Sequence, residues 1–418
     1  MRLLHTECLE LTDFVGNAKP PYAILSHTWG EGEILFDDVQ HGRPHLLACG
    51  KLGLAKVLKA AEVAKDNGYD YIWIDTCCID KSSSAELSEA INSMFAWYAE
   101  SAVCYAHISD FHSEKPEQLS TKNRWFTRGW TLQELIAPPA VDFYNQQWVK
   151  FGNRDGLWSL LSSLTGIEEL VFRWHPYPRC PVPARAATGQ HDPSAWPRCG
   201  LCRADLADML DTFSIATRMS WAANRNTTRE EDIAYSLLGL FGVNLPLLYG
   251  ERHAAFQRLQ HEIVRRSTDQ SIFTFSVPRN GLQVPGSGFA LPLHFLFAAS
   301  PSWFRQRSRQ WTNKHFGLET PMVLLSSVAM QLDVYIAPAE HLQWFYIAVL
   351  ICSSVDDALC SPAFLVKKIP GSSTRRRFSR VWLAAEPHSP DEMPLSVSAG
   401  SGAAVGRSRS GGQRMQVT

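Results

Sequence analysis

A group of side chains that could bind a ligand follows the apolar run "YAIL" at residues 22–25. Ser26 and His27 come first, and Trp29 and Gly30 follow within three residues. The carboxyl ends of parallel strands are where α/β proteins bind their ligands, so a strand ending here would place all four residues at a binding edge. The serine could bind polar groups, Trp29 could stack on a ring, and Gly30 would let the chain turn closely.

An ordinary packed turn is the alternative for the same residues. In that interpretation, His27 and Trp29 hold the loop on Trp73 or Trp130 and take no part in binding. The residue types alone fit both interpretations, so the choice depends on where a fold places them.

Two aspartates flank the residues "TCCI" at the end of a second apolar run, "YIWI". A strand alternates its side chains between two faces, so at least one of Asp75 and Asp80 should reach the same edge as Ser26. Asp75 could bind a ligand hydroxyl there, or it could cap the loop that follows.

The adjacent cysteines Cys77 and Cys78 offer a different chemistry. In an extended chain they point to opposite faces, so they cannot bind one metal ion together. A nucleophilic pair of Cys77 and His27 would need the imidazole beside the thiol. Buried, unreactive cysteine is the more common fate of such residues.

The order of apolar runs and helical patterns indicates how these residues are positioned. Four strand-like runs, near residues 22–26, 71–75, 102–109 and 140–145, alternate with helical patterns, the second of which starts at the capping box Ser83-x-x-Glu86. This alternation predicts an α/β domain whose mostly parallel sheet has helices on both faces. Right-handed crossovers would place the loops after the strands on one edge.

Three ordered blocks in this region resemble the heterokaryon incompatibility (HET) domain of filamentous fungi. They are "YAILSHTWG", "GYDYIWIDTCCIDKSSSAELSEAINSMFAWYAESAVCYAHI" and "NRWFTRGWTLQELIAP", and residues 219–263 are similar to the helical region that usually follows the domain. The resemblance implies a role in non-self recognition and regulated cell death. It also implies a distant relation to Toll/interleukin-1 receptor (TIR) domains, whose fold is flavodoxin-like and some of whose members hydrolyse NAD.

The TIR relation singles out Glu134 as the catalytic carboxylate. TIR enzymes carry the catalytic glutamate in a "W-C-x-x-E-L" helix, and here "W-T-L-Q-E-L" places Trp130 and Glu134 at that spacing, with Thr131 in place of cysteine. A carboxylate near the ribose would stabilise the positive charge that develops as nicotinamide leaves. NAD is then a possible substrate, no cofactor is tightly bound, and the residues expected to bind NAD are Ser26, His27, Trp29, Gly30, Asp75 and Trp130. The alternative is that Glu134 lies on the solvent side of a short helix or pairs with Arg128.

The chain divides by composition into five predicted segments. They are the HET domain (1–165), an irregular Pro/Arg-rich insert (166–203), a helical extension (204–270), a β-rich module (271–386) and a disordered Ser/Gly/Arg-rich tail (387–418). A second capping box, Thr228-x-x-Glu231, precedes a helical pattern in the extension. The insert departs from the family pattern, so a retained intron is one explanation for it. Its Cys180, His191, Cys199 and Cys202 could form a zinc knuckle, but a single C-x-x-C is weak support and we predict no metal site.

Composition limits the partners that the chain could have. A formal net charge of -1 and a pI near 6.9 provide no general basic field, so we expect no nucleic-acid partner. The acidic residues in "MRLLHTECLELTDF" argue against a signal peptide, and the longest apolar runs are shorter than the roughly 20 residues that span a bilayer. We therefore expect a cytoplasmic protein without membrane contact. The resemblance implies self-association through the HET domain or contact with another incompatibility protein, and a purely signalling role without catalysis stays open.

Overall fold

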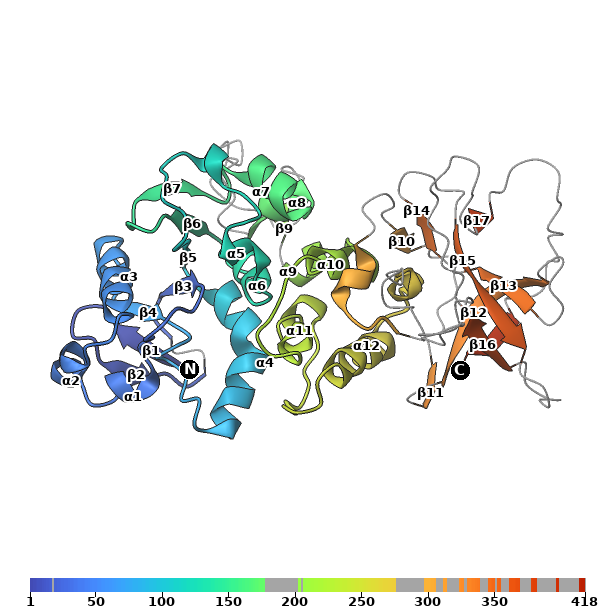
Figure 1. Ribbon diagram of the computed structural model, residues 1–418, viewed down its shortest axis with the longest axis horizontal. Coiled ribbons are helices and arrows are strands. Elements are labelled where there is room, and N and C mark those ends of the chain that lie inside the picture. The colour runs from blue at the N-terminus through green and yellow to red at the C-terminus, as the bar shows by residue number, and fades with distance from the viewer. Residues whose placement is uncertain are drawn as a thin grey trace, which may run out of the picture. The chain divides into compact units, whose positions relative to one another are not determined.

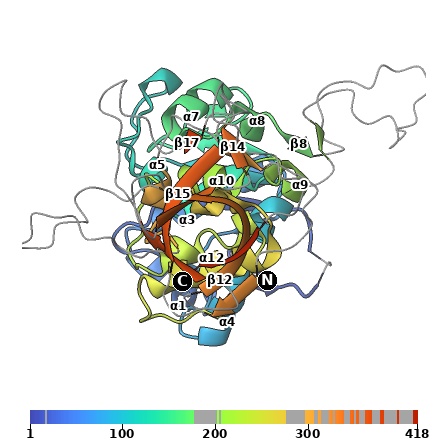
Figure 2. The same cartoon turned by 90° about the vertical axis from the view of Figure 1, so that its right-hand side faces the viewer.

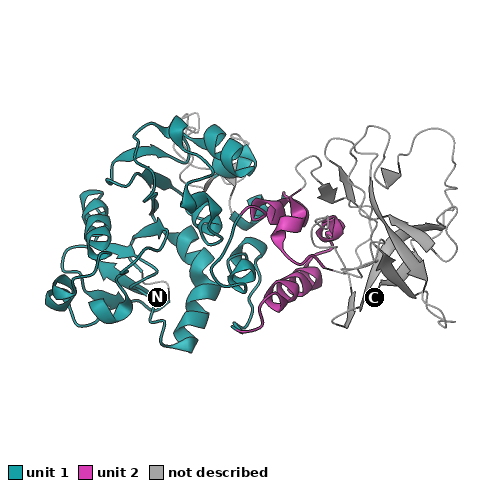
Figure 3. Ribbon diagram, in the orientation of Figure 1, with its two compact units in different colours: residues 1–212, 225–249 teal, residues 213–224, 250–418 magenta. Residues whose placement is uncertain are grey.

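The computed structural model describes residues 1–16, 19–176, 202–203, 206–275 and 297–305, and the backbone of short strands between residues 311 and 417 (Figure 1). It contains two compact units, each described by itself below. The first unit comprises residues 1–212 and 225–249, and the second comprises residues 213–224 and 250–418 (Figure 3).

A seven-stranded mixed sheet is the centre of the first unit. Its strands lie in the order β2-β1-β4-β3-β5-β6-β7. The four central strands are parallel, and the outer strands pair antiparallel. This is the α/β class that the sequence predicts. The bounds are β1 (Arg2–His5), β2 (Leu11–Asp13), β3 (Ala23–His27), β4 (Tyr71–Trp73), β5 (Val103–His107), β6 (Val141–Tyr144) and β7 (Lys150–Asn153).

The parallel strands follow the order in which flavodoxin-like sheets are wound. From β3 the chain moves to β4 on one side, and from β4 it returns past β3 to β5 on the other side. Because both crossovers are expected to be right-handed, they place α3 (Leu54–Asp66) and α4 (Ser84–Glu100) on opposite faces, as Figure 1 shows. The carboxyl ends of β3 and β5 thus meet where the winding direction reverses, which is the usual ligand-binding position of such sheets.

Local sequence explains the two long helices of this unit. Ser83 caps α4, and its side chain accepts a hydrogen bond from the backbone N–H of Glu86, as the capping box predicts. The face of α3 that packs on the sheet consists of Val57 and small alanines, so the helix lies close to the strands. The other helices of the unit are α1 (Phe36–Val39), α2 (Arg43–Ala48), α5 (Arg124–Thr127), α6 (Thr131–Ile136), α7 (Trp158–Thr165), α8 (Glu169–Phe172), α9 (Leu206–Leu210) and α11 (Asp232–Tyr235), with short 3-10 turns at Pro116–Gln118 and Gly239–Phe241.

Residues 225–249 are an integral part of the first unit, although they are separated from it in sequence. Asn226 forms a parallel bridge with Arg128, in which its N–H donates to the carbonyl of Thr127 at 2.6 Å and its carbonyl accepts from the N–H of Gly129 at 2.9 Å. Further along, the side chain of Asn92 on α4 makes two hydrogen bonds with the backbone of residue 245. The segment therefore covers parts of both α4 and the region before α6.

The second unit combines helices with C-terminal strands. Its helices are α10 (Ile215–Trp221) and α12 (Ala254–Arg266), with 3-10 turns at Gln270–Phe273 and Pro301–Phe304. Its C-terminal strands include a closed ring of β12, β13, β15, β16 and β18 (Figure 2). The strands are β10 (Trp311–Asn313), β11 (Val323–Ser326), β12 (Ala329–Pro338), β13 (Phe345–Val349), β14 (Cys352–Ser354), β15 (Ser361–Lys368), β16 (Arg377–Val381), β17 (Ser396–Val397) and β18 (Gln413–Val417).

Two segments differ from the composition-based expectations. Strands β17 and β18 lie in the range for which composition predicted disorder. Strand β17 pairs with β15, and β18 pairs with β12 and β16. At the ends of the predicted insert, β8 (His175–Pro176) pairs parallel with β9 (Cys202–Arg203). The zinc-knuckle alternative involves Cys180, His191 and Cys199, which lie outside the described residues.

Candidate functional site

The carboxyl edge of the parallel strands collects most of the predicted site residues. His27 ends β3, His107 ends β5, and the two are register partners in the parallel pairing. Asp75 follows two residues after the end of β4. The expectation that the strand-end loops share one edge is thus met.

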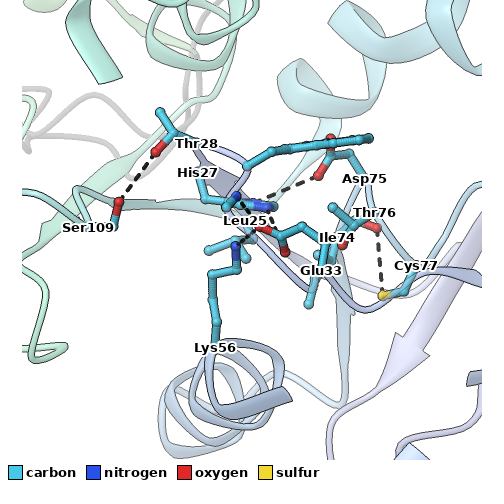
Figure 4. Close-up of polar contacts among 12 residues, drawn as sticks. Leu25, His27, Thr28, Glu33, Lys56, Ile74, Asp75, Thr76, Cys77 and Ser109 are labelled. Carbon is cyan, nitrogen blue, oxygen red and sulfur yellow. Dashed lines mark hydrogen bonds and ion pairs between the residues drawn. The ribbon is translucent and has the colours of Figure 1, made fainter. Parts of the chain in front are cut away.

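The alternation of β3 divides the predicted residues into two groups. The side chain of Ser26 contacts Glu134 of α6 and Trp125 of α5. The next side chain, His27, points to the other face, toward Glu33 and Asp75 (Figure 4). Because consecutive strand residues face opposite sides, one strand serves two separate polar groups.

Glu134 lies in the interior and is only 7% exposed. The hydroxyl of Ser26 donates to Glu134 Oε2 at 2.5 Å and accepts from the indole N–H of Trp125 at 2.8 Å. Burial raises the pKa of Glu134, the hydrogen bond from Ser26 lowers it and the charge of Asp75 raises it, and with the smaller effects of Arg225 and Arg128 the pKa is about 8. Glu134 is therefore mostly neutral at pH 7, and it neither faces solvent nor pairs with Arg128, whose guanidinium donates to the Thr228 hydroxyl.

His27 lies between two carboxylates with no close hydrogen bond to either. Its Nε2 is 3.8 Å from Glu33 Oε2 and its Nδ1 is 3.8 Å from Asp75 Oδ1. Among the described residues, neither ring nitrogen and neither of these oxygens has a hydrogen-bond partner. Burial lowers the pKa of His27 well below its ordinary value, and the charge of Lys56 lowers it further. A neutral imidazole can donate one hydrogen bond and accept another, so this cluster can hold polar groups.

Trp29 is partly exposed and contacts Asp75 and Lys81. It is 39% exposed, and its indole N–H donates to Asp75 Oδ2 at 2.7 Å. The Lys81 ammonium lies 4.0 Å from the centre of the ring and donates to the carbonyl of Asp75. Trp29 therefore does not pack into the core against Trp73, and the packed-turn alternative does not hold for it.

Two other predicted residues, Gly30 and Trp130, have plainer surroundings. Gly30 is not required for a close turn, since a Cβ there would meet only Glu33 Oε1 at 3.8 Å, whereas Gly32 has a φ of +65°. The indole N–H of Trp130 donates to Asp232 at 3.4 Å, on the segment 225–249 and apart from the Ser26 hydrogen bonds.

The Cys77–His27 pair does not form. The thiol of Cys77 contacts the carbonyl of Ile74, and it lies away from His27 in Figure 4. A hydrogen bond with Cys78 raises the pKa of Cys77 well above its ordinary value, and burial adds to this. Both effects oppose the thiolate that nucleophilic catalysis needs.

Several residues of the site were not predicted. Glu33 and Lys56 form an ion pair at 2.5 Å beside His27, and Glu33 also accepts from the N–H of Gly30. In the sequence, Glu33 cannot be told apart from the exposed Glu31 two positions earlier. Arg225 was not predicted because it lies 94 residues after Thr131 in the sequence, and no local pattern links it to α6.

Two classes of feature are absent from the described part of the chain. No group of three or more histidine, cysteine, aspartate or glutamate side chains there could hold a metal ion. None of the helices described is long and apolar enough to span a membrane.

Comparison with known proteins finds a family match for the part of the chain that contains β3, β4 and β5, but not for α6. Residues 22–122 match the family model "Heterokaryon incompatibility protein (HET)", and residues 254–287 match a domain of unknown function, DUF8212. The chain is 40% identical over 278 residues to the vegetative incompatibility protein HET-E-1 of Podospora anserina. The match takes in 63% of this chain but 18% of that relative. No solved structure matches the chain.

Proposed function

Because residues 22–122 form a heterokaryon incompatibility (HET) domain, as the sequence blocks predicted, we propose that this chain acts in vegetative incompatibility. Its similarity to a vegetative incompatibility protein over 278 residues supports this role. In this proposal, the chain recognises non-self in the fungal cytoplasm and triggers regulated cell death. Its partner is a second copy of the HET domain or another incompatibility protein.

We further propose that the HET domain cleaves NAD. The bond between the nicotinamide nitrogen and ribose C1′ breaks, nicotinamide leaves with the bonding electrons as a neutral ring, and water adds to the ribosyl cation with loss of a proton. Ionised Glu134 would stabilise the cation. The observation that supports this role is the buried Glu134 carboxyl, bonded to Ser26 where β3 ends.

Three of the other predicted residues, Trp29, Asp75 and His27, have roles in the same proposal. Trp29 offers an exposed indole on which a ring of NAD can stack. Asp75 Oδ1 is buried and has no hydrogen-bond partner among the described residues, so it would accept a ribose hydroxyl once a ligand displaces what covers it, and His27 would bind a further polar group beside it. NAD carries a positive charge on its nicotinamide ring, so its approach would favour the ionised form of Glu134.

A non-catalytic signalling module is the second candidate. The observation that favours it is the burial of Glu134, whose neutral carboxyl already has a hydrogen-bond partner in Ser26. Such a group can simply hold α6 on β3. The HET domain would then act only by binding another HET domain.

Nicotinamide release from NAD separates the two candidates. The full chain, fused to an inducible dimerisation module, is compared with Glu134→Gln and with Glu89→Gln, which changes an exposed glutamate of α4. Release by the wild type and Glu89→Gln, and its loss in Glu134→Gln, would support catalysis. If clustered, folded wild type releases no nicotinamide while its expression still kills cells, the signalling module is correct.

A further inference from the structure

Helix α6, which carries Glu134, is held at both ends by buried arginines. At its start, Arg225 Nη1 donates to the carbonyl of Arg128 at 2.9 Å and to the hydroxyl of Thr131 at 2.8 Å. At its end, Arg154 donates four hydrogen bonds to carbonyls within and just after the last turn. Arg225 and Arg154 are 9% and 1% exposed.

The hydrogen bonds of Arg154 explain its burial, whereas those of Arg225 explain its burial only in part. The last carbonyls of a helix lack partners within the helix, so Arg154 satisfies acceptors that would otherwise be unpaired. Arg225 finds no comparable row of acceptors, and its buried Nη2 has no partner among the described residues. A buried guanidinium in this state needs a nearby negative charge.

Glu134 is placed to provide that charge. It follows Thr131 by three residues on α6, and side chains at this spacing lie on the same side of a helix. Arg225 lowers the pKa of Glu134, and Glu134 in turn raises the pKa of Arg225, which burial lowers to about 10. The effect is mutual, as expected for two groups that share a buried environment.

Other charged and titratable groups also face Glu134. Arg128 lowers its pKa and Asp75 raises it. From α4 and β5, Tyr98 and Cys104 face it as neutral groups, because burial raises both of their pKa values well above the ordinary ones and the charge of Glu134 raises them further. Arg225 is the buried cation of this set, and it comes from the segment 225–249, beyond the residues that match the HET family model.

We propose that Arg225 is a positioning residue for Glu134, which fixes the first turn of α6 and supplies the positive charge that favours the ionised carboxylate. Through Arg225, the segment 225–249 thereby contributes to the ionisation of Glu134. The consequence for catalysis rests on the proposed NAD cleavage, whereas the effect on ionisation does not.

Carbon-13 NMR titration of the Glu134 carboxyl in the full chain tests the proposal, with the signal assigned by its loss in Glu134→Gln. Arg225→Gln should raise the titration midpoint by about one pH unit or more. Arg225→Lys keeps the charge and should move the midpoint less. Arg154→Gln is the matched control, since it also removes a buried arginine from α6. It should lower the melting temperature and leave the midpoint in place.

An unchanged midpoint in Arg225→Gln, or an equal shift in Arg154→Gln, would overturn the proposal. If Arg225→Gln fails to fold, nitrogen-15 spectra of the wild-type arginine side chains test the proposal in its place. The Arg225 resonances should shift with the midpoint of Glu134 and lose that shift in Glu134→Gln. Arg225 resonances that do not shift at the titration midpoint of Glu134 would refute the proposed role of Arg225.

Kinetics then separate this proposal from the proposed function. If the wild type releases nicotinamide, Arg225→Gln should move the pH profile of kcat/KM in the alkaline direction, together with the NMR midpoint. If the NMR midpoint moves but the wild type releases no nicotinamide, NAD cleavage fails and the assignment of Arg225 stands.

Discussion

At the scale of single residues, Glu134 makes the stability of the fold depend on pH. Its pKa in the folded chain is about 8, above the ordinary value of 4.5. The neutral carboxyl therefore favours the folded state. This stabilisation is complete below the unfolded pKa and is lost as the pH rises through about 8.

Glu134→Gln removes this dependence. Relative to wild type, the free energy of unfolding of the variant should increase between about pH 5 and pH 8, by a few kcal/mol in order of magnitude. Urea unfolding at several pH values measures it, with Glu89→Gln as the exposed control. A difference between wild type and variant that stays constant over this range would contradict the assignment of a buried, neutral Glu134.

The proposed catalysis should have the matching pH profile. Only ionised Glu134 can stabilise a ribosyl cation, and the free chain holds it mostly neutral below about pH 8. We therefore expect kcat/KM for NAD to rise about tenfold per pH unit below this value and to level off above it. A kcat/KM that falls with pH over the same range would show that an acid, not this carboxylate, limits the reaction.

Ser26 couples Glu134 to Trp125, and a double-mutant cycle can measure the coupling. Ser26→Ala leaves the buried indole N–H of Trp125 and the Glu134 carboxyl without this partner, at a cost of about 1–3 kcal/mol in unfolding free energy. Ser26→Ala combined with Trp125→Phe should cost less than the sum of the single changes. Strict additivity would mean that the Trp125–Ser26 hydrogen bond contributes nothing.

The residue scale also shows what sequence reasoning could reach. The spacing of "W-T-L-Q-E-L" pointed to Glu134, and the alternation of a strand already implied that Ser26 and His27 face opposite sides. The burial of Glu134 and the approach of Arg225 depend on tertiary contacts, which no local pattern encodes. The expected need for Gly30 failed because a turn residue was inferred from its type, whereas the left-handed conformation lies at Gly32.

At the scale of elements, the loop after β3 is fixed by its contact with the start of α3. A Cβ at Gly53 would lie 2.8 Å from the carbonyl oxygen of Gly32 and 2.9 Å from the Cα of Glu33. Both are backbone atoms, so they cannot move aside cheaply. The position of Glu33 beside His27 thus depends on Gly53, the residue that precedes α3.

Gly53→Ala should destabilise the fold by about 1–3 kcal/mol through this overpacking. Gly30→Ala in the same loop is the control, since its Cβ would make only an ordinary contact, and it should cost less than 1 kcal/mol or so. Thermal unfolding of both variants compares them. Equal effects of the two changes would show that the loop adapts freely.

The two predicted capping boxes had different outcomes for a physical reason. Ser83 caps α4, a long helix whose start is set locally. Thr228 instead accepts a hydrogen bond from Arg128, and α11 begins at Asp232 with no side-chain cap. The same motif did not form a cap where distant contacts hold the segment in place.

The parallel sheet was predictable because apolar runs and helical periods alternate from about residue 22 to residue 145.

At the scale of the whole molecule, the first unit is discontinuous in sequence. Residues 225–249 bridge to Arg128, bond to Asn92, and place Phe95 so close to Gly239 that no side chain fits there. A fragment that ends before this segment exposes these surfaces. The matched HET residues are therefore only part of the folded unit.

Truncation tests this directly. A fragment of residues 1–275 should show near-UV circular dichroism and cooperative unfolding, and a fragment of residues 1–176 should lose both while keeping helical far-UV signal. Matched salt and protein concentration exclude aggregation as the cause. Native-like near-UV signal and cooperative unfolding in the shorter fragment would show that residues 225–249 are dispensable.

The same discontinuity has a consequence for how the chain is made. Until the ribosome reaches residues 225–226, the nascent protein already contains Glu134 but lacks Arg225 and Asn226, the residue that bridges to Arg128. At about 5–20 residues per second, the 91 residues from 134 to 225 take roughly 5–18 seconds. The surroundings of the Glu134 carboxyl are thus completed only after more than half of the chain has been translated.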